Sequence, residues 1–577
     1  MNRLPSRLRI AAIAIVIASS SAAQSPTPVL SASSDEATRW ADETLSRLSL
    51  KQKVAQMMCE QMRGDYTATD SEAFRYWSEL ARDYGIGGFV VYGGTPHETA
   101  ALINRLQNEA ELPLLMSADF EGGPGQQFAG ASEFPANMAL SAAGDETLAY
   151  EVGRVGAREG RAIGIHLTYS PVVDIQTRPE NPVLSVRSFG ADVDLLGRMA
   201  SALIRGYQDN GMLATAKHYP GRGDVDFLTD SEYLINRKAA AQVEAEDLAA
   251  FKKAIDAGVS FVMSEHIEVP SITEGSNLPA SASPALSTTW LRHRLGFEGV
   301  LTTDDLWYPK VVARFGAERA GVLAIQAGHD VLLKPANTIK MIDAVVAAVE
   351  AGALTPQRID ASVRRILYWK ARLNLHRERL VDVGRIASIV GSKEHLDLVQ
   401  RIAERSLTVL ANRDVFPTTA AELGTITHVS IQKRDDDTAP AEVSRKLNAS
   451  LPVKNEFVIR PNVNPSLYEV ALASARETDT VIVSLFHQRT VYRDNGALSV
   501  PDQEWLQRII RDNPRTIVMA YGNPYAINGL ESAAAFVVGY GEGGFYGNQL
   551  VYADAFVRLL RGEIEATGKL PVTTSLP

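Results

Sequence analysis

The side chains best suited to chemistry follow the apolar residues 211–216. They stand on one loop that reads Lys217-His218-Tyr219-Pro220-Gly221-Arg222-Gly223-Asp224 and continues to Asp230-Ser231-Glu232. Glycines in this loop permit backbone angles that other residues resist, so the loop can bend over a ligand and present carboxyl groups to it. A second acidic site, Thr303-Asp304-Asp305, also ends an apolar run. Two carboxyl groups at the ends of two strands predict acid-assisted cleavage of a polar bond.

Charged side chains recur at the ends of the predicted strands of this chain. An unpaired buried charge is costly, so several such strand ends together indicate a site rather than a set of unrelated loop caps. Barrel enzymes place their active sites at the carboxyl ends of their strands. The predicted strands cover residues 87–92, 114–119, 167–174, 212–217, 259–265, 300–304 and 330–333. The charged groups that end them are Asp119, Asp174, Lys217, Glu265-His266 and Asp304.

The elements that position these groups alternate between short apolar strands and amphipathic helices, such as 96–108 and 194–209, where Asp194 is a candidate N-cap. Seven or eight such units predict a (β/α)8 TIM-type barrel over residues 40–375.

A charged linker is predicted at 376–400, followed by a second alternation of strands and helices. That alternation predicts an α/β sandwich domain over 401–577, so the fold class is α/β with two domains. Its predicted strands are 425–431, 480–486, 516–521 and 534–538.

The first residues are typical of an export signal. Three arginines precede the apolar run 10–18, and small residues at 21–23 offer a cleavage site. A membrane anchor is the alternative, but spanning a bilayer takes roughly twenty apolar residues, more than this run provides. We therefore predict a cleaved signal peptide at 1–23, a linker at 24–39, and a periplasmic or secreted mature protein with no membrane attachment.

Composition and spacing exclude several classes of function. The formal net charge of -10 argues against binding nucleic acid, which needs a basic surface. Cys59 is the only cysteine, so an internal disulfide and a thiolate metal site are excluded.

His218 has no second histidine four residues on, and neither a metal nor another cofactor is expected. A Gly-x-Ser-x-Gly elbow is absent, which argues against a serine hydrolase. His166 and His329 stand in apolar stretches and are expected in the core.

Taken together, these motifs resemble those of glycoside hydrolase family 3, and most of all its bacterial β-N-acetylglucosaminidases in their two-domain form. That subgroup carries Lys-His-Phe-Pro-Gly-His-Gly and then Asp-Ser-His on one loop, to which residues 217–223 and 230–232 are similar. Three more family motifs resemble Asp119-Phe120-Glu121-Gly122-Gly123, Arg187-Ser188-Phe189-Gly190 and Thr303-Asp304-Asp305-Leu306. Shorter similarities at 48–54, 403–408 and 568–573 extend the resemblance over about residues 40–577.

The resemblance implies a retaining, exo-acting β-glycoside hydrolase that works through a covalent glycosyl-enzyme. It makes Asp304 the nucleophile. It also implies that the sugar is bound by Asp119, Arg187, Lys217 and His218, with Asp174 supporting the same pocket.

The acid/base is where this chain departs from the subgroup, because Glu232 replaces the catalytic histidine. A free glutamate titrates at about 4.3, so the pKa of Glu232 must rise by roughly two units before it can donate a proton near neutral pH. The negative charges of Asp230 and Asp304 favour that rise. Glu232 is therefore the expected acid/base, with Asp230 and then Asp226 as the next candidates.

The sugar is predicted from the motifs that are kept and those that are lost. Arg222 replaces the second histidine of the loop motif, and Gln127 stands where the subgroup has a sugar-binding arginine. The kept motifs favour a β-N-acetylhexosaminidase that releases terminal N-acetylglucosamine from cell-wall or chitin-type glycans. The alternatives are a β-glucosidase or related exo-β-glycosidase, and a non-catalytic sugar-binding relative. In the second domain, His487, Arg489 and Asp494 are expected on a solvated loop.

Overall fold

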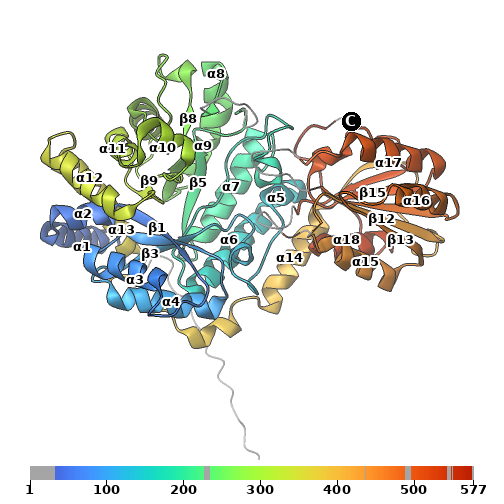
Figure 1. Ribbon diagram of the computed structural model, residues 1–577, viewed down its shortest axis with the longest axis horizontal. Coiled ribbons are helices and arrows are strands. Elements are labelled where there is room, and N and C mark those ends of the chain that lie inside the picture. The colour runs from blue at the N-terminus through green and yellow to red at the C-terminus, as the bar shows by residue number, and fades with distance from the viewer. Residues whose placement is uncertain are drawn as a thin grey trace, which may run out of the picture.

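The computed structural model describes residues 33–225, 234–435, 437–487, 496–541, 548 and 550–574. The predicted signal peptide lies outside these residues, and so do Asp226, Asp230, Glu232, Arg489 and Asp494. Two domains lie side by side along the longest axis of the molecule (Figure 1).

The first domain is a barrel of parallel strands, as predicted. Its sheet has eight strands in the order β10-β1-β2-β3-β4-β5-β7-β9, and a bridge between Thr302 and Val331 joins β9 to β10 and closes the ring. The seven predicted strands are all present. They are β2 (Gly88–Tyr92), β3 (Leu115–Ala118), β4 (Leu167–Thr168), β5 (Leu213–Tyr219), β7 (Phe261–Ser264), β9 (Val300–Thr303) and β10 (Leu332–Leu333).

The eighth strand, β1 (Met58–Arg63), was not predicted. Gln61 and Arg63 within it are exposed, so the strand lacks the continuous apolar run of its neighbours. By contrast, every residue of β3, β5, β7 and β9 is buried, as expected for parallel strands covered by helices.

Helices cover the outside of the barrel (Figure 1). One of them, α7 (Val193–Gln208), corrects a predicted cap: the side chain of Asp192 accepts the Leu195 amide at 2.7 Å, while Asp194 instead pairs with Lys253.

No helix within the described ranges is long and apolar enough to cross a membrane. The other main helices are α2 (Leu50–Gln56), α3 (Glu72–Glu79), α4 (Pro96–Glu109), α5 (Asn137–Ala143), α6 (Glu146–Ile163), α9 (Ala249–Asp256), α10 (Pro309–Phe315), α11 (Ala317–Ala327), α12 (Thr338–Glu350) and α13 (Pro356–Arg372).

The predicted linker at 24–39 gives way to a helix within the described residues. Helix α1 (Ser34–Arg47) begins at Ser34, where the Ser33 side chain accepts the Glu36 amide and caps it. Buried alanines on α1 pack it against α13, so the barrel domain begins earlier than predicted.

The second domain is the predicted α/β sandwich. Its six-stranded sheet has the order β11-β16-β15-β14-β12-β13. Four strands were predicted, namely β12 (Ile426–Gln432), β14 (Thr480–Phe486), β15 (Thr516–Ala520) and β16 (Ala535–Val538). The two edge strands, β11 (Thr408–Asn412) and β13 (Val453–Ile459), were not, because their side chains are largely half-buried or exposed. Figure 1 shows α16 (Ser466–Arg476) and α17 (Val500–Asp512) on one face, and α15 (Ala439–Ser450) and α18 (Val551–Leu560) on the other.

The predicted linker at 376–400 is mostly packed structure. It contains a short 3-10 helix at Val383–Ser388 and the first half of α14 (Lys393–Ser406). The buried His395 side chain on α14 lies 2.6 Å from the Glu159 carboxylate on α6. The segment predicted as a charged linker therefore carries a buried side chain that anchors α14 to the barrel.

The end of the chain returns from the sandwich to the barrel. The Lys569 amide donates to the Ala142 carbonyl at 2.9 Å, and the Ala191 amide donates to the Pro571 carbonyl at 3.0 Å. A Cβ on Gly190 would come within 2.4 Å of the Pro571 carbonyl oxygen. The tail therefore packs closely against the segment that carries the predicted sugar ligand Arg187.

Candidate active site

A cavity of about 170 Å³ opens among the loops at the carboxyl ends of the barrel strands. Five of the residues predicted for the site line it, namely Asp119, Arg187, Lys217, His218 and Asp304. The other lining residues are Tyr92, Glu121, Gln126, Tyr169, Val183, Arg222, Met263, Asp305 and Leu333. The structure thus brings together side chains that the sequence places on separate strands and loops.

Lys217 and His218 both reach this cavity, although adjacent residues of a regular strand point to opposite faces. The pairing of β5 with β7 shifts register between Lys217 and Tyr219. Such an irregularity interrupts the alternation of side chains. The expectation that both side chains meet one ligand at the strand end is consistent with this geometry.

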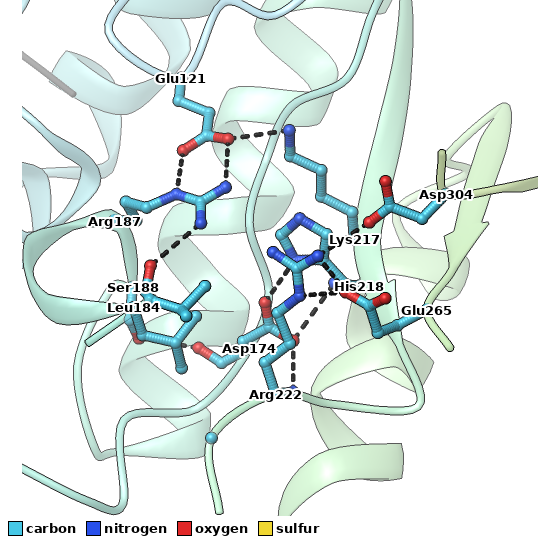
Figure 2. Close-up of polar contacts among 12 residues, drawn as sticks. Glu121, Asp174, Leu184, Arg187, Ser188, Lys217, His218, Arg222, Glu265 and Asp304 are labelled. Atoms are coloured by element: carbon cyan, nitrogen blue, oxygen red, sulfur yellow. Dashed lines mark hydrogen bonds and ion pairs between the residues drawn. The ribbon is translucent and has the colours of Figure 1, made fainter. Parts of the chain in front are cut away.

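Glu121 is the centre of a buried group of charges on one wall of the cavity. Arg187 donates two hydrogen bonds of 2.7 Å to its carboxylate, and the Lys217 ammonium lies 2.8 Å from Glu121 Oε1 (Figure 2). The same ammonium lies 2.8 Å from Asp119 Oδ1. Burial alone would raise the pKa of Glu121, but Arg187 and Lys217 outweigh it and the pKa lies below its ordinary value. This wall therefore holds fixed charged donors and acceptors of the kind that bind sugar hydroxyls.

Lys217→Met is expected to destabilise the barrel by about 3–5 kcal/mol, because it leaves the buried Glu121 carboxylate and the partly buried Asp119 carboxylate with less positive charge nearby. Thermal unfolding measured by calorimetry checks this. Lys51→Met is the matched control, since Lys51 pairs with Asp343 at 3.2 Å where both side chains are more than half exposed. Its loss should cost less than about 1 kcal/mol. Equal unfolding temperatures for the two variants would contradict the importance of the buried group.

Asp174 lies beneath the cavity rather than in its wall, which makes its predicted role in sugar binding an indirect one. Its carboxylate accepts the backbone amides of His218 at 3.2 Å and Arg222 at 2.8 Å, and it lies 2.7 Å from His218 Nδ1. Burial raises the pKa of Asp174 to about 6 and holds the pKa of His218 well below its usual range. Above that pH the ionised carboxylate accepts a hydrogen bond from Nδ1–H, which leaves Nε2 of a neutral His218 as an acceptor for a hydroxyl.

Asp304 follows β9 and has both carboxylate oxygens engaged. Oδ1 accepts the Asp305 amide at 2.7 Å, and Oδ2 accepts the Arg222 guanidinium at 2.8 Å. The Asp304 amide in turn donates to the Ser264 carbonyl of β7 at 2.8 Å. Burial alone would raise the pKa of Asp304, but Arg222 outweighs it and the pKa lies below the ordinary value. Asp304 is thus an ionised, oriented carboxylate facing the cavity, which is what a nucleophile requires.

Three buried groups of the site were not predicted as site residues. Glu121 was part of a recognised motif, Arg222 was noted only as a departure, and Glu265 was counted among the strand-end charges that indicate a site but was given no role in it. Arg222 in fact contacts Glu265 as well as Asp304 (Figure 2). Another unpredicted cation, Lys334, follows β10 and lies 2.7 Å from Asp305. Its position after a strand was the available signal.

The remaining predictions have mixed outcomes. Asp230 and Glu232 lie outside the described residues, so the choice of acid/base stays a prediction. Gln127 is buried, and its side-chain oxygen accepts the Gly93 amide at 3.3 Å, while its neighbour Gln126 lines the cavity.

The two histidines that were expected in the core are buried there. His166 Nδ1 accepts the Met116 amide at 3.1 Å, and His329 contacts Ser264. Burial holds the pKa of both rings below the ordinary value, so the prediction that they are core residues is confirmed.

Comparison with known proteins agrees with this architecture. The family model "Glycosyl hydrolase family 3 N terminal domain" matches residues 49–368. A beta-N-acetylglucosaminidase/beta-glucosidase of Cellulomonas fimi is 31% identical over 386 residues, which are 65% of this chain and 67% of that protein. Beta-hexosaminidase A of Pseudoalteromonas piscicida is 29% identical over 375 residues, 59% of this chain and 62% of that protein, which is less than two thirds of its length.

A solved structure resembles almost the whole chain. It is a glycoside hydrolase family 3 β-N-acetylglucosaminidase from Paenibacillus sp. str. FPU-7, 28% identical, with a TM-score of 0.78 over 92% of this chain and 100% of that chain. The family model, the barrel with its sandwich domain, and the acidic strand ends therefore lead to one assignment: the chain belongs to glycoside hydrolase family 3.

Proposed function

We propose that this protein is a retaining, exo-acting β-glycoside hydrolase that releases terminal N-acetylglucosamine. The observation that carries the proposal is the ionised Asp304 carboxylate, held in the wall of a polar cavity by Arg222 and the Asp305 amide. The cavity of about 170 Å³ is small beside the roughly 300–1,000 Å³ of pockets for larger ligands. Room for one sugar ring supports removal of terminal residues rather than cleavage within a chain.

In the first step, an Asp304 oxygen attacks the anomeric carbon while the bond to the leaving oxygen breaks. Glu232 gives its proton to that oxygen, so the leaving group departs as an alcohol and a glycosyl ester of Asp304 remains. In the second step, Glu232 takes a proton from water, the water oxygen bonds to the anomeric carbon, and Asp304 leaves as a carboxylate. Two displacements at one carbon retain its configuration.

The buried group of charges around Glu121 also supports binding of a terminal sugar in this cavity. Asp119 and His218 Nε2 offer acceptors, and Lys217 and Arg187 offer donors, among the side chains that line the cavity with Asp304. A terminal sugar presents several hydroxyls that are each both donor and acceptor. Side chains whose own partners are fixed hold such a ring without large reorganisation.

Two observations bear on which sugar is bound. The loop motif at 217–221 and the motif at 187–190 are similar to those of β-N-acetylglucosaminidases, and the relatives with that name support this substrate. The loss of the arginine at position 127 favours the alternative, a β-glucosidase, and the Cellulomonas fimi relative carries both activities in its name.

The protein is expected to hydrolyse an aryl β-N-acetylglucosaminide with a kcat/KM at least about tenfold above that of the matching aryl β-glucoside, a difference of about 1.4 kcal/mol. Steady-state assays with the two substrates measure this, and NMR of the first product should show the β-anomer. A preference for the glucoside would establish the β-glucosidase instead. Binding of N-acetylglucosamine with no hydrolysis of either substrate would indicate a non-catalytic sugar-binding protein.

We also propose export of the mature protein to the periplasm or beyond the cell. The positive start and the apolar run at 10–18 support this proposal. Such a location would bring the enzyme to cell-wall or chitin-type glycans that end in N-acetylglucosamine.

A further inference from the structure

Arg222 is held between two carboxylates at the point where the reaction is proposed to occur. Its Nη2 lies 2.8 Å from Asp304 Oδ2, and its guanidinium also contacts the Glu265 carboxylate (Figure 2). Its backbone amide donates to Asp174 Oδ1 at 2.8 Å, and only 6% of the residue is exposed. Arg222 is therefore fixed at both its backbone and its side chain, beside the nucleophile.

Glu265 is as constrained as Arg222. Its amide donates to the Tyr219 carbonyl at 2.7 Å, and its Oε1 accepts the His266 amide at 2.7 Å. The residue is 4% exposed, and it follows β7, the strand beside β9. Arg222 thus connects the Glu265 carboxylate to the nucleophile, and the two carboxylates follow adjacent barrel strands.

The positive charge of Arg222 has two opposite effects on the reaction. A guanidinium in contact with Asp304 orients its carboxylate and keeps it ionised. Glycosyl transfer, however, passes through a transition state with positive charge on the sugar ring. A cation in the cavity without a counter-charge would oppose that positive charge, because interactions between charges are strong where water is excluded.

We propose that Arg222 and Glu265 are a matched pair of positioning residues for Asp304. Arg222 aligns and ionises the nucleophile, and Glu265 cancels the positive potential that Arg222 would otherwise impose on the anomeric carbon. This proposal rests on the proposed function. It is particular to this chain within the resemblance described above, because the loop motif of the subgroup has a histidine at position 222.

The other cations in the cavity wall support this assignment. Lys217 and Arg187 have Asp119 and Glu121 as carboxylate partners, at 2.8 Å or less. Arg222 is the lining cation whose partner is the nucleophile itself. When Asp304 becomes an ester it loses its negative charge, and Glu265 is then the carboxylate that still neutralises Arg222.

A double-mutant cycle on kcat tests the pairing, using an aryl glycoside with a good leaving group so that proton donation is not limiting. Glu265→Gln and Arg222→Met are each expected to lower kcat about 100-fold. The double variant should retain more activity than Glu265→Gln alone, because it no longer holds an uncompensated cation. Arg222→Lys should recover part of the loss, since it keeps the charge. If the fold-loss in kcat of the double variant equals the product of the losses of the two single variants, the proposal is overturned.

Ligand binding gives a readout that does not need turnover. A cationic iminosugar resembles the charge of the transition state, so Glu265→Gln should weaken its binding about tenfold and Arg222→Met should tighten it. Calorimetric titration measures both, and binding of uncharged N-acetylglucosamine should change less than about threefold in either variant. Equal shifts for the charged and the neutral ligand would contradict the proposal and indicate a structural role.

The controls distinguish a failure of the pairing from misfolding of a variant and from failure of the proposed function. Arg445→Met removes an exposed pair with Glu442 and should leave both readouts unchanged. Thermal unfolding of each variant identifies one that fails to fold, and Arg222→Lys then still tests the pairing. If the wild-type protein binds the iminosugar but hydrolyses no aryl glycoside, the proposed function fails, while the binding comparison still decides whether Glu265 offsets Arg222.

Discussion

Asp304→Asn is expected to lower kcat at least about 10⁴-fold while leaving the protein folded. The amide has the size of the carboxylate but cannot form the glycosyl ester. Arg222 keeps a second carboxylate partner in Glu265, so the substitution leaves no isolated buried cation. Steady-state assays on an activated aryl glycoside measure the loss. Intact-mass spectra with a slow 2-fluoro glycoside should show the adduct on the wild-type protein and not on the variant.

The matched control for this experiment is Asp343→Asn on α12. Asp343 is 61% exposed and pairs with Lys51 at 3.2 Å. Its substitution should change kcat less than about twofold, because surface substitutions far from a site cost little. Turnover by Asp304→Asn at more than about a tenth of the wild-type rate would show that another group attacks the sugar.

Glu232→Ala is expected to slow hydrolysis of glycosides with poor leaving groups about 10³-fold, and that of dinitrophenyl glycosides less than about tenfold in the glycosylation step. A poor leaving oxygen needs a proton in the transition state, whereas an activated phenolate departs without one. Rates for a series of leaving groups measure the contrast. Added azide should restore turnover and yield a β-glycosyl azide, because azide attacks the glycosyl ester without a general base.

Asp230→Ala is the companion variant, since Asp230 is the next candidate on the same loop. It should show neither the leaving-group contrast nor the azide product. If Asp230→Ala shows both and Glu232→Ala shows neither, the acid/base is Asp230. If neither variant responds, Asp226 is to be changed next.

The sequence was most informative where burial is complete. The interior strands β3, β5, β7 and β9 are buried throughout, and each was predicted close to its observed bounds. The half-exposed edge strands β11 and β13 were missed, because a strand that faces water on one side carries polar residues.

The same contrast applies to the site. Asp119, Lys217 and Asp304 were predicted because a charge at the end of an apolar strand is visible in the sequence itself. Their partners were not, because an ion pair between distant residues leaves no local pattern. Arg222 and Glu265 are 43 residues apart in the chain, and Arg187 and Glu121 are 66 apart. Only the closed barrel brings these loops to one edge.

The returning tail has a consequence for how the enzyme is made. The Ala191 amide has the Pro571 carbonyl as its partner, four residues from Arg187. Translation proceeds from the N-terminus, so the barrel strands are synthesised long before residue 571 leaves the ribosome. The Arg187 segment therefore acquires this contact only after residue 571 has been synthesised, and a product terminated before that residue would lack the contact however well its barrel had folded.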